Sequence, residues 1–230
     1  MSKRKNQLLF FMVVAVLFLL INLYFYQKNN NSSDSDNKRG YGLHDLPKKS
    51  EYLSEDYILG GYLQDSIFND VKYFPLAAIQ GAEEFYFEQS FGLARTYGGD
   101  RKHEGTDIMT PDNIRGTCPV ISVCNGTVTN IGWLELGGYR VGVLSEQGVY
   151  YYYAHLYRYD TMIAEGSRVS AGQILGYAGD SGYGAEGTTG QFDVHLHFGI
   201  YLNDEEGNEV ALDPYPLLKN LRNKMLRFFD

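Results

Sequence analysis

The sequence predicts an all-β domain built on an antiparallel sheet, and three observations carry this prediction. Tyr, Phe and Gly are abundant, with 20, 13 and 26 copies among 230 residues. Aromatic side chains favour pleated strands, and glycine favours turns. Short apolar stretches alternate with glycine-rich turns from about residue 83 onward, and no long helical period interrupts them between Tyr97 and Leu212. The predicted sheet is therefore antiparallel, with no crossover helices.

Six stretches carry the strand pattern of this core. They are EFYFEQ (84–89), GTVTNIGW (126–133), YRVGVLS (139–145), GVYYYYAHL (148–156), QILGYAG (173–179) and FDVHLHFGIYL (192–202). In the last stretch Asp193, His195 and His197 alternate with apolar residues, so they are expected on one face of a strand. By the same alternation, Tyr151, Tyr153 and His155 are expected to share a face.

The amino-terminal region differs from this core. Residues 8–26, LLFFMVVAVLFLLINLYFY, form a nearly unbroken apolar run of membrane-spanning length. A cleaved signal peptide is the alternative, but it needs a shorter apolar core and a small-residue cleavage site. Residues 1–27 are therefore predicted to be a cytoplasmic tip and an uncleaved single-pass anchor. Lys3, Arg4 and Lys5 precede the apolar run, which predicts that the folded domain lies outside the cell membrane.

The flanking segments divide the rest of the chain. Residues 28–50 are polar and low in complexity, which predicts a flexible linker. Leu59, Leu63, Ile67 and Val71 recur every four residues, as in an amphipathic helix. The predicted divisions are a helical extension packed on the core (51–80), the β-core (81–216) and a carboxy-terminal surface helix (217–230) with Leu217, Leu221, Met225 and Phe228 turned inward.

Charge and cysteine content exclude some functions. The net charge is −8, and the chain after residue 30 holds 16 basic and 28 acidic residues. An acidic domain of this kind argues against nucleic acid as a partner, because nucleic acids bind basic surfaces. The two cysteines, Cys118 and Cys124, do not form a CxxC zinc motif, and both are expected to be free and buried.

Four of the five histidines lie between residues 103 and 197, and their spacing suggests a metal site. In HEGTD, Gly105 would let the backbone bend so that His103 and Asp107 converge. In HLHF, two imidazoles on one strand face suit one metal ligand beside one group that acts on water. Three nitrogen and oxygen ligands with one open position are typical of catalytic zinc. The alternative is that each histidine is an isolated polar residue on a solvated face.

Three motifs resemble those of a known family. HEGTD (103–107), YYAHL (152–156) and HLHF (195–198) resemble the HxxxD, central histidine and HxH motifs of LytM/lysostaphin-type zinc metallopeptidases, which are peptidoglycan endopeptidases. The connecting segments also occur in the family's order. They are GTVTNIGW, GSRVSAGQILGYAGDSG, TTGQFDVHLHF and the Asp213-Pro214 pair. The resemblance covers about residues 85–215.

The resemblance implies a sheet of the duplicated hybrid motif type and a membrane-anchored enzyme that hydrolyses peptidoglycan peptide bonds with zinc-activated water. Carried over by position, it implies the zinc ligands His103, Asp107 and His197 and the catalytic residues His155, His195 and Tyr97. His155 and His195 would serve the water and the tetrahedral intermediate, and Tyr97 would stabilise an oxyanion.

Other functions remain as alternatives. LytM-like domains also act as non-catalytic scaffolds or activators of envelope proteins, including in sporulation, so envelope protein partners are possible. Such inactive domains usually lack a ligand, and this chain lacks none of the motif residues. GDSG (179–182) matches the nucleophile loop of trypsin-like proteases only in part, and GYGAEG (182–187) precedes a predicted strand rather than the helix of a dinucleotide site. HEGTD half-matches the helical HExxH motif, but its glycine opposes a helix.

Overall fold

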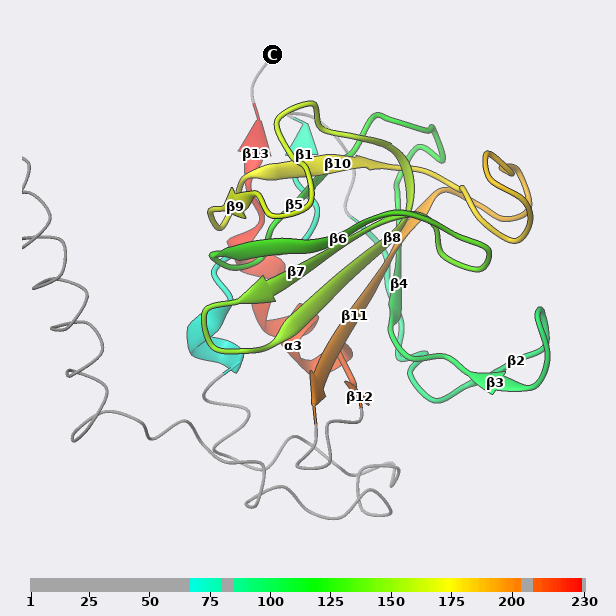
Figure 1. Cartoon of the computed structure of the whole chain (residues 1–230), viewed down its shortest axis with the longest axis horizontal. Coiled ribbons are helices and arrows are strands. Elements are labelled where there is room, and N and C mark those ends of the chain that lie inside the picture. The colour runs from blue at the N-terminus through cyan, green and yellow to red at the C-terminus, as the bar shows by residue number, and fades with distance from the viewer. Residues whose placement is uncertain (1–66, 80–84, 204–208, 229–230) are drawn as a thin grey trace, which may run out of the picture. The chain divides into compact units, whose positions relative to one another are not determined.

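The computed structural model describes residues 67–79, 85–203 and 209–228 (Figure 1). The predicted anchor and linker lie outside these residues, as does most of the predicted helical extension. Among the described residues, no helix has the length and apolar character needed to cross a membrane. Their regular elements are β1 (Ala78–Ile79), β2 (Ala94–Arg95), β3 (Arg101–Lys102), β4 (Thr106–Met109), β5 (Pro119–Ile121), β6 (Gly126–Leu134), β7 (Gly138–Ser145), β8 (Tyr150–Tyr159), β9 (Arg168–Val169), β10 (Ile174–Ala178), β11 (His195–Asn203), β12 (Glu209–Leu212), helix α3 (Tyr215–Leu221), 3-10 helix η2 (Arg222–Lys224) and β13 (Arg227–Phe228).

One antiparallel sheet organises the domain, which confirms the all-β prediction. Its strands follow the order β12-β11-β8-β7-β6-β9, while β4 pairs with β11, and β10 pairs with both β5 and β8. Figure 1 shows β4, β11 and β8 running beside one another. Five of the six predicted stretches form strands of this sheet. Of the sixth stretch, the described residues 85–89 contribute only an isolated bridge between Tyr86 and Met109.

Strand β11 divides its side chains between the core and the opposite face. Leu196, Phe198 and Ile200 are fully buried in the hydrophobic core. The ring of Phe198 lies against those of Tyr151 and Tyr153, with centroids 6.2 and 5.4 Å away. This apolar packing holds β8 and β11 in a fixed register. Because strand side chains alternate, the histidines of β11 lie on the other face, as the sequence predicted.

Strand β8 departs from simple alternation at His155. Tyr151 and Tyr153 enter the core, whereas the next polar side chain in the series, His155, does not follow them. His155 has a left-handed backbone (φ 62°), and the β7–β8 register shifts beside it, between Tyr139 and Val141. A bulge of this kind turns a side chain to the opposite face. The prediction that Tyr151, Tyr153 and His155 share a face is therefore wrong.

The segment before the sheet contributes to the core in an unexpected conformation. Residues 67–70 are helical, and Ile67 and Val71 are buried as predicted. Beyond them the chain is extended rather than helical, and Phe74 and Leu76 are fully buried in the same core as the sheet. The packed domain therefore includes residues that lie before the predicted boundary at residue 81.

The carboxy-terminal helix is shorter than predicted and begins earlier. Helix α3 starts at Tyr215 and has Pro216 in its first turn, where the missing amide hydrogen costs no helical hydrogen bond, and it buries Leu217, Leu218 and Leu221. Phe228, predicted to lie on this helix, instead lies in β13, which pairs in parallel with β1. The backbone amide of Ala78 donates to the carbonyl of Leu226 (2.9 Å), so this end of the chain forms a small sheet with the segment that precedes the core.

Leu218→Ala should lower the free energy of unfolding by about 2–5 kcal/mol, because the leucine is fully buried and its loss leaves a cavity. Asn220→Ala is the control on the exposed face of the same helix and should change stability by less than about 0.5 kcal/mol. Urea denaturation measures both. Equal effects of the two substitutions would show that α3 does not pack on the core.

Candidate functional site

Two neighbouring strands and the turn before one of them bring together His103, Asp107 and His197. Asp107 on β4 is the direct cross-strand partner of His197 on β11. His103 lies in the turn that leads into β4, where its backbone amide donates to the carbonyl of Leu93 (2.9 Å). His103 Nε2, Asp107 Oδ1 and His197 Nδ1 lie 3.0 Å from one another in all three pairs. These three atoms form a small triangle, so a single metal ion could contact all of them.

Gly105 makes this triangle possible. A Cβ atom at residue 105 would lie 2.6 Å from His197 Cε1 and Nε2 and 2.7 Å from the carbonyl oxygen of Phe198. The ring of His197 therefore occupies the space that any other residue's side chain would need. The sequence predicted a glycine-dependent bend at this position, and the structure shows that close packing is the reason for the glycine.

Hydrogen bonds orient the ligand atoms toward one another. His103 Nδ1 donates to the carbonyl of Ser90 (3.0 Å), which leaves a lone pair on its Nε2. The second carboxylate oxygen of Asp107 accepts from Arg95 Nη2 (2.8 Å), so Asp107 presents one oxygen to the histidines. Only a proton or a metal cation can hold three such electron-rich atoms together. In the metal-free protein a neutral His197 with its proton on Nδ1 can supply that proton, and a metal cation would replace it and use all three atoms as ligands.

The protonation states also suit a metal. Burial raises the pKa of Asp107. The hydrogen-bond contacts with His103 and His197 act in the opposite direction, and together with the nearby charges they outweigh burial, so the pKa lies well below the usual carboxyl range. Burial lowers the pKa of His197, against the opposing effect of Asp107. At neutral pH the group therefore offers a carboxylate and a neutral imidazole. Two ligand atoms of a tetrahedral zinc ion with bonds of about 2.05 Å lie about 3.3 Å apart. The 3.0 Å separations of the three atoms here are close to that distance.

His155 and His195 lie beside the triangle without being part of it. Their rings are 4.7 Å apart, and His195 Nε2 lies 3.7 Å from Asp107 Oδ1. Each Nδ1 donates to a backbone carbonyl, that of Ser181 for His155 (2.8 Å) and that of Asp193 for His195 (2.7 Å). Each Nε2 is therefore free to accept a proton. Burial, followed by the nearby His195 and His197, lowers the pKa of His155 well below its ordinary value, so its imidazole is neutral at pH 7.

These side chains open into one pocket of about 290 Å³. The residues that line it are Arg95, Arg101, His103, Asp107, Leu136, Gly137, Tyr152, His155, Tyr183, Phe192, His195 and His197. The pocket therefore contains both the candidate metal group and the two additional imidazoles. It also contains aromatic and basic side chains that can contact a bound peptide.

Comparison with known proteins identifies the domain. The sequence model of peptidase family M23 matches residues 101–214. This range contains the three candidate metal ligands and the two additional histidines, His155 and His195. Residues 101–214 belong to peptidase family M23. The chain is 41% identical over 136 residues to the L-Ala–D-Glu endopeptidase of Bacillus subtilis (strain 168), with 59% of this chain and 40% of that protein covered. It is 36% identical over 120 residues to the lysostaphin of Staphylococcus simulans, with 51% and 22% covered.

A solved structure agrees with this assignment. The crystal structure of a LytM protein from Ruminococcus gnavus ATCC 29149 superposes with a TM-score of 0.67 and 47% identity, covering 73% of this chain and 66% of that one. The chain spans two fifths or less of the length of the two curated relatives described above. The similarity therefore concerns the M23 domain and its immediate surroundings.

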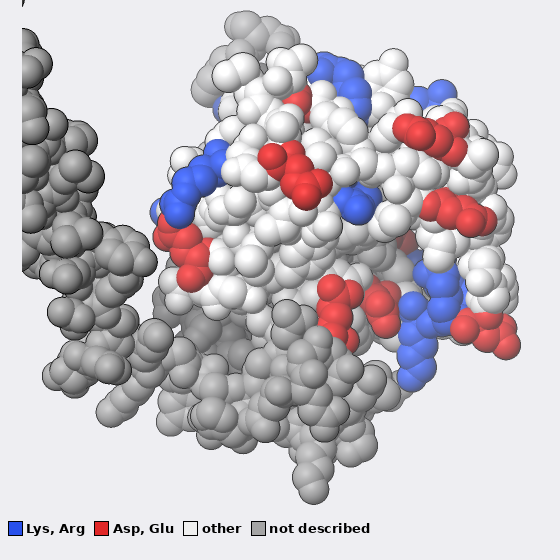
Figure 2. All heavy atoms as spheres, viewed as in Figure 1, with Lys and Arg blue, Asp and Glu red and all other residues white. Residues whose placement is uncertain are grey.

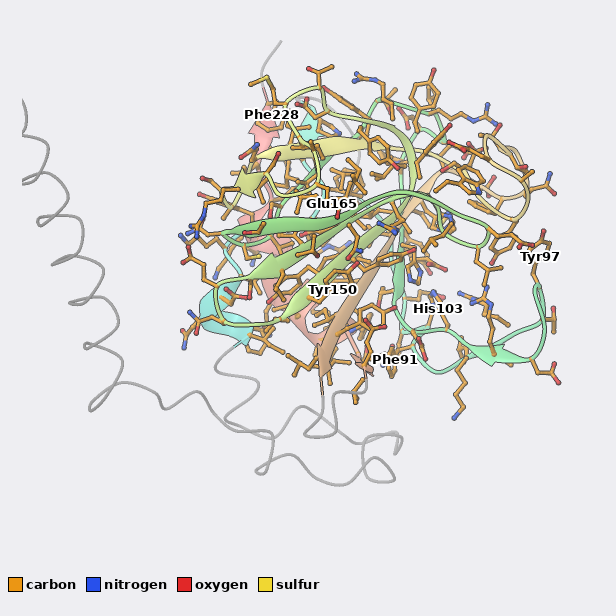
Figure 3. All side chains as sticks on the ribbon, viewed as in Figure 1. Phe91, Tyr97, His103, Tyr150, Glu165 and Phe228 are labelled. Atoms are coloured by element: carbon orange, nitrogen blue, oxygen red, sulfur yellow. The ribbon has the colours of Figure 1, made fainter. Side chains whose placement is uncertain are left out.

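Tyr97 does not reach the pocket of the M23 domain in the described structure. It lies at the turn of the β2–β3 hairpin, away from His103 beside β4 (Figure 3). Its ring stacks on Tyr183 with centroids 4.2 Å apart, and its hydroxyl donates to the Tyr183 carbonyl (2.6 Å). Tyr183 thus lies between Tyr97 and the imidazoles. The catalytic role assigned to Tyr97 stays a prediction.

Two further sequence motifs do not have the geometry of the catalytic sites that they partly match. Ser181 of GDSG is fully buried, donates to the carbonyl of Leu156 (2.6 Å) and accepts from the amide of Tyr139 (3.0 Å). His155 contacts the carbonyl of Ser181 rather than its hydroxyl, so this serine is not activated as a nucleophile. Glu104 is exposed and precedes a strand, which excludes a helical HExxH site.

Sequence reasoning missed Arg95, Arg101, Tyr183 and Phe192, which line the pocket. The two arginines flank the stretch TYGGD (96–100), and glycines at 98 and 99 are typical of a hairpin turn. That signal could have paired the arginines. Tyr183 lies in a loop with no periodic pattern, and Phe192, the first residue of the predicted strand 192–202, lies before β11 begins at His195.

His197→Ala should abolish metal binding, because the triangle then loses a rigidly placed nitrogen ligand that no nearby side chain can replace. His195→Ala is the matched control two residues away on the same strand face, and it should keep its metal. Elemental analysis of the purified proteins after zinc loading and dialysis measures the difference. Full metal occupancy in the His197 variant would overturn the ligand assignment.

Proposed function

We propose that the protein is a zinc metalloendopeptidase that hydrolyses peptide bonds of cell-wall peptidoglycan. The observation that carries this proposal is the triangle of His103, Asp107 and His197 beside two further imidazoles, each oriented by a hydrogen bond from its Nδ1 atom to a backbone carbonyl, in one pocket. Membership in peptidase family M23 and similarity to an L-Ala–D-Glu endopeptidase support a peptide of the cell wall as the substrate. The bond that is cleaved stays open at this level.

The chain's own residues divide the work. His103, Asp107 and His197 would hold the zinc ion, and Arg95 would keep the second oxygen of Asp107 turned away from it. Bound zinc supplies Lewis acidity, which polarises a peptide carbonyl and makes water acidic near pH 7. The Nε2 lone pair of His155 or His195 accepts the proton of the attacking water and later returns it to the leaving amine.

The protonated forms of these histidines have a second use. An imidazolium beside the reacting carbonyl stabilises the negative charge that develops on its oxygen. The backbone carbonyls of Ser181 and Asp193 fix the direction of both rings, so little reorganisation is needed during the reaction. The non-catalytic scaffold alternative predicts a depleted site. The described residues instead bring all five polar side chains together.

Chelation tests the enzymatic proposal. Purified peptidoglycan incubated with the zinc-loaded protein should release new amino groups, and an excess of a zinc chelator should stop the release. Added zinc should restore it. Release that is insensitive to the chelator would contradict metal-dependent hydrolysis, and no release at all would favour the scaffold.

We also propose that residues 8–26 anchor the protein in the cell membrane with the M23 domain outside. The apolar run and the preceding Lys3, Arg4 and Lys5 support this orientation. After removal of the wall, protease added to intact cells should cut the linker at residues 28–50 and release the domain. Protection of the domain until the membrane is dissolved would reverse the proposed topology.

His155→Ala and His195→Ala should each retain zinc and lose about 10²- to 10⁴-fold in kcat/KM, the range typical of a proton-transfer or oxyanion-stabilising group. Glu104→Gln is the control, because Glu104 is an exposed carboxylate adjacent to the ligand His103 and should stay within about tenfold of wild type. Peptide-cleavage kinetics with parallel zinc analysis measure these effects. A large loss in the Glu104 variant with zinc still bound would make that carboxylate the base.

A further inference from the structure

The β2–β3 hairpin places two arginines directly opposite each other at the pocket. Arg95 and Arg101 are cross-strand partners in the antiparallel register, so their side chains leave the hairpin on the same face. Both line the pocket that contains the candidate metal group. Like charges directly opposite each other destabilise a strand pair unless something compensates them. The pair therefore needs an explanation beyond the folding of the hairpin.

Of these two arginines, only Arg95 has an anionic partner among the described residues. Its Nη2 atom forms an ion pair with Asp107 Oδ2 at 2.8 Å. Arg101 contacts only uncharged oxygens, with Nε donating to the Tyr97 carbonyl (3.2 Å) and Nη2 donating to the Tyr183 hydroxyl (3.2 Å). Asp107 is the one carboxylate among the residues that line the pocket. In the described structure, the charge of Arg101 thus remains without a counterion in the pocket.

Arg101 lies within reach of the reacting groups. Arg101 donates to the hydroxyl of Tyr183, whose ring centroid lies 6.1 Å from that of His155 and 5.0 Å from that of Phe192. An extended peptide spans about 3.3–3.6 Å per residue. The distance from Arg101 to the imidazoles, across Tyr183, therefore corresponds to only a few residues of a bound peptide. Figure 2 shows basic side chains beside the β2–β3 hairpin with acidic side chains on either side of them, on a protein whose net charge is −8.

We propose that Arg101 binds a free carboxylate of the substrate, carried by a residue within a few positions of the cleaved bond. The preferred substrates are then acidic peptides, and converting that carboxylate to a carboxamide weakens them. The planar guanidinium suits this role because it donates paired hydrogen bonds to a carboxylate. This inference rests on the proposed peptidase function and adds to it the chemical class of the substrate.

A purely structural role for Arg101 makes a different prediction. Its two contacts join the hairpin to the loop that carries Tyr183, so its removal could loosen the pocket. Such loosening would reduce the cleavage of every peptide by a similar factor. Recognition of a carboxylate instead changes the ratio of kcat/KM between an acidic peptide and its carboxamide. The ratio therefore separates the two roles.

The test uses a short peptide containing L-Ala–D-Glu with one glutamate carboxylate free, and the same peptide with that group as a carboxamide. The zinc-loaded wild-type protein should cleave the acidic peptide about 10- to 100-fold more efficiently, as expected for charge-assisted hydrogen bonds. Arg101→Met should reduce this ratio to about one, and Arg101→Lys should retain part of it. Lys102→Met is the control, since Lys102 is exposed and does not line the pocket, and it should leave the ratio unchanged.

Binding separates failure of the inference from failure of the proposed function. If neither peptide is cleaved, release of amino groups from purified peptidoglycan decides whether the peptidase proposal fails, and calorimetric titration with the two intact peptides still tests Arg101. Tighter binding of the acidic peptide, lost in Arg101→Met, would support carboxylate recognition. Equal cleavage or equal binding of the two peptides by the wild-type protein would overturn it, as would a ratio that Arg101→Met leaves intact.

Discussion

The backbone register between β4 and β11 is the constraint on which the site depends. It sets Asp107 directly opposite His197, and it lets the His197 ring lie over the bare backbone of Gly105. A shift of one residue would turn both histidines of β11 into the core and Phe198 out of it. The fully buried Phe198, packed against Tyr151 and Tyr153, opposes that shift. Core packing on one face of the sheet thus fixes the ligand geometry on the other.

Several unfavourable features gather at the pocket. His155 and Tyr183 have left-handed backbones, at φ 62° and 58°, a conformation that is uncommon for residues other than glycine. Arg95 and Arg101 oppose each other across two strands, and three ligand atoms meet at 3.0 Å. Features of this kind persist where the surrounding structure holds them in place and function uses them. Here the single large sheet and its aromatic core supply that support.

The sequence predicted the parts of this arrangement that follow from strand alternation. The two histidines of HLHF share a face because β11 is regular, and GTVTNIGW and YRVGVLS pair as strands of one antiparallel sheet. Alternation failed at His155, because a bulge depends on tertiary contacts such as the bond from its amide to the Gly137 carbonyl. The strand Arg227–Phe228 was missed because its partner Ala78–Ile79 lies about 150 residues away, and no local pattern encodes that pairing. Arg95 and Arg101 were missed for a similar reason, since two-residue strands carry no period.

X-ray absorption at the zinc K-edge of the zinc-loaded protein tests the central claim most directly, because it identifies the donor atoms around the metal. The account predicts a first shell of nitrogen and oxygen only, with the signature of two imidazoles from His103 and His197 and a carboxylate oxygen from Asp107. The described cysteines, Cys118 and Cys124, are buried free thiols outside the pocket, so sulfur should be absent from the shell. Sulfur scattering at about 2.3 Å, or a shell with no imidazole signature, would contradict the account.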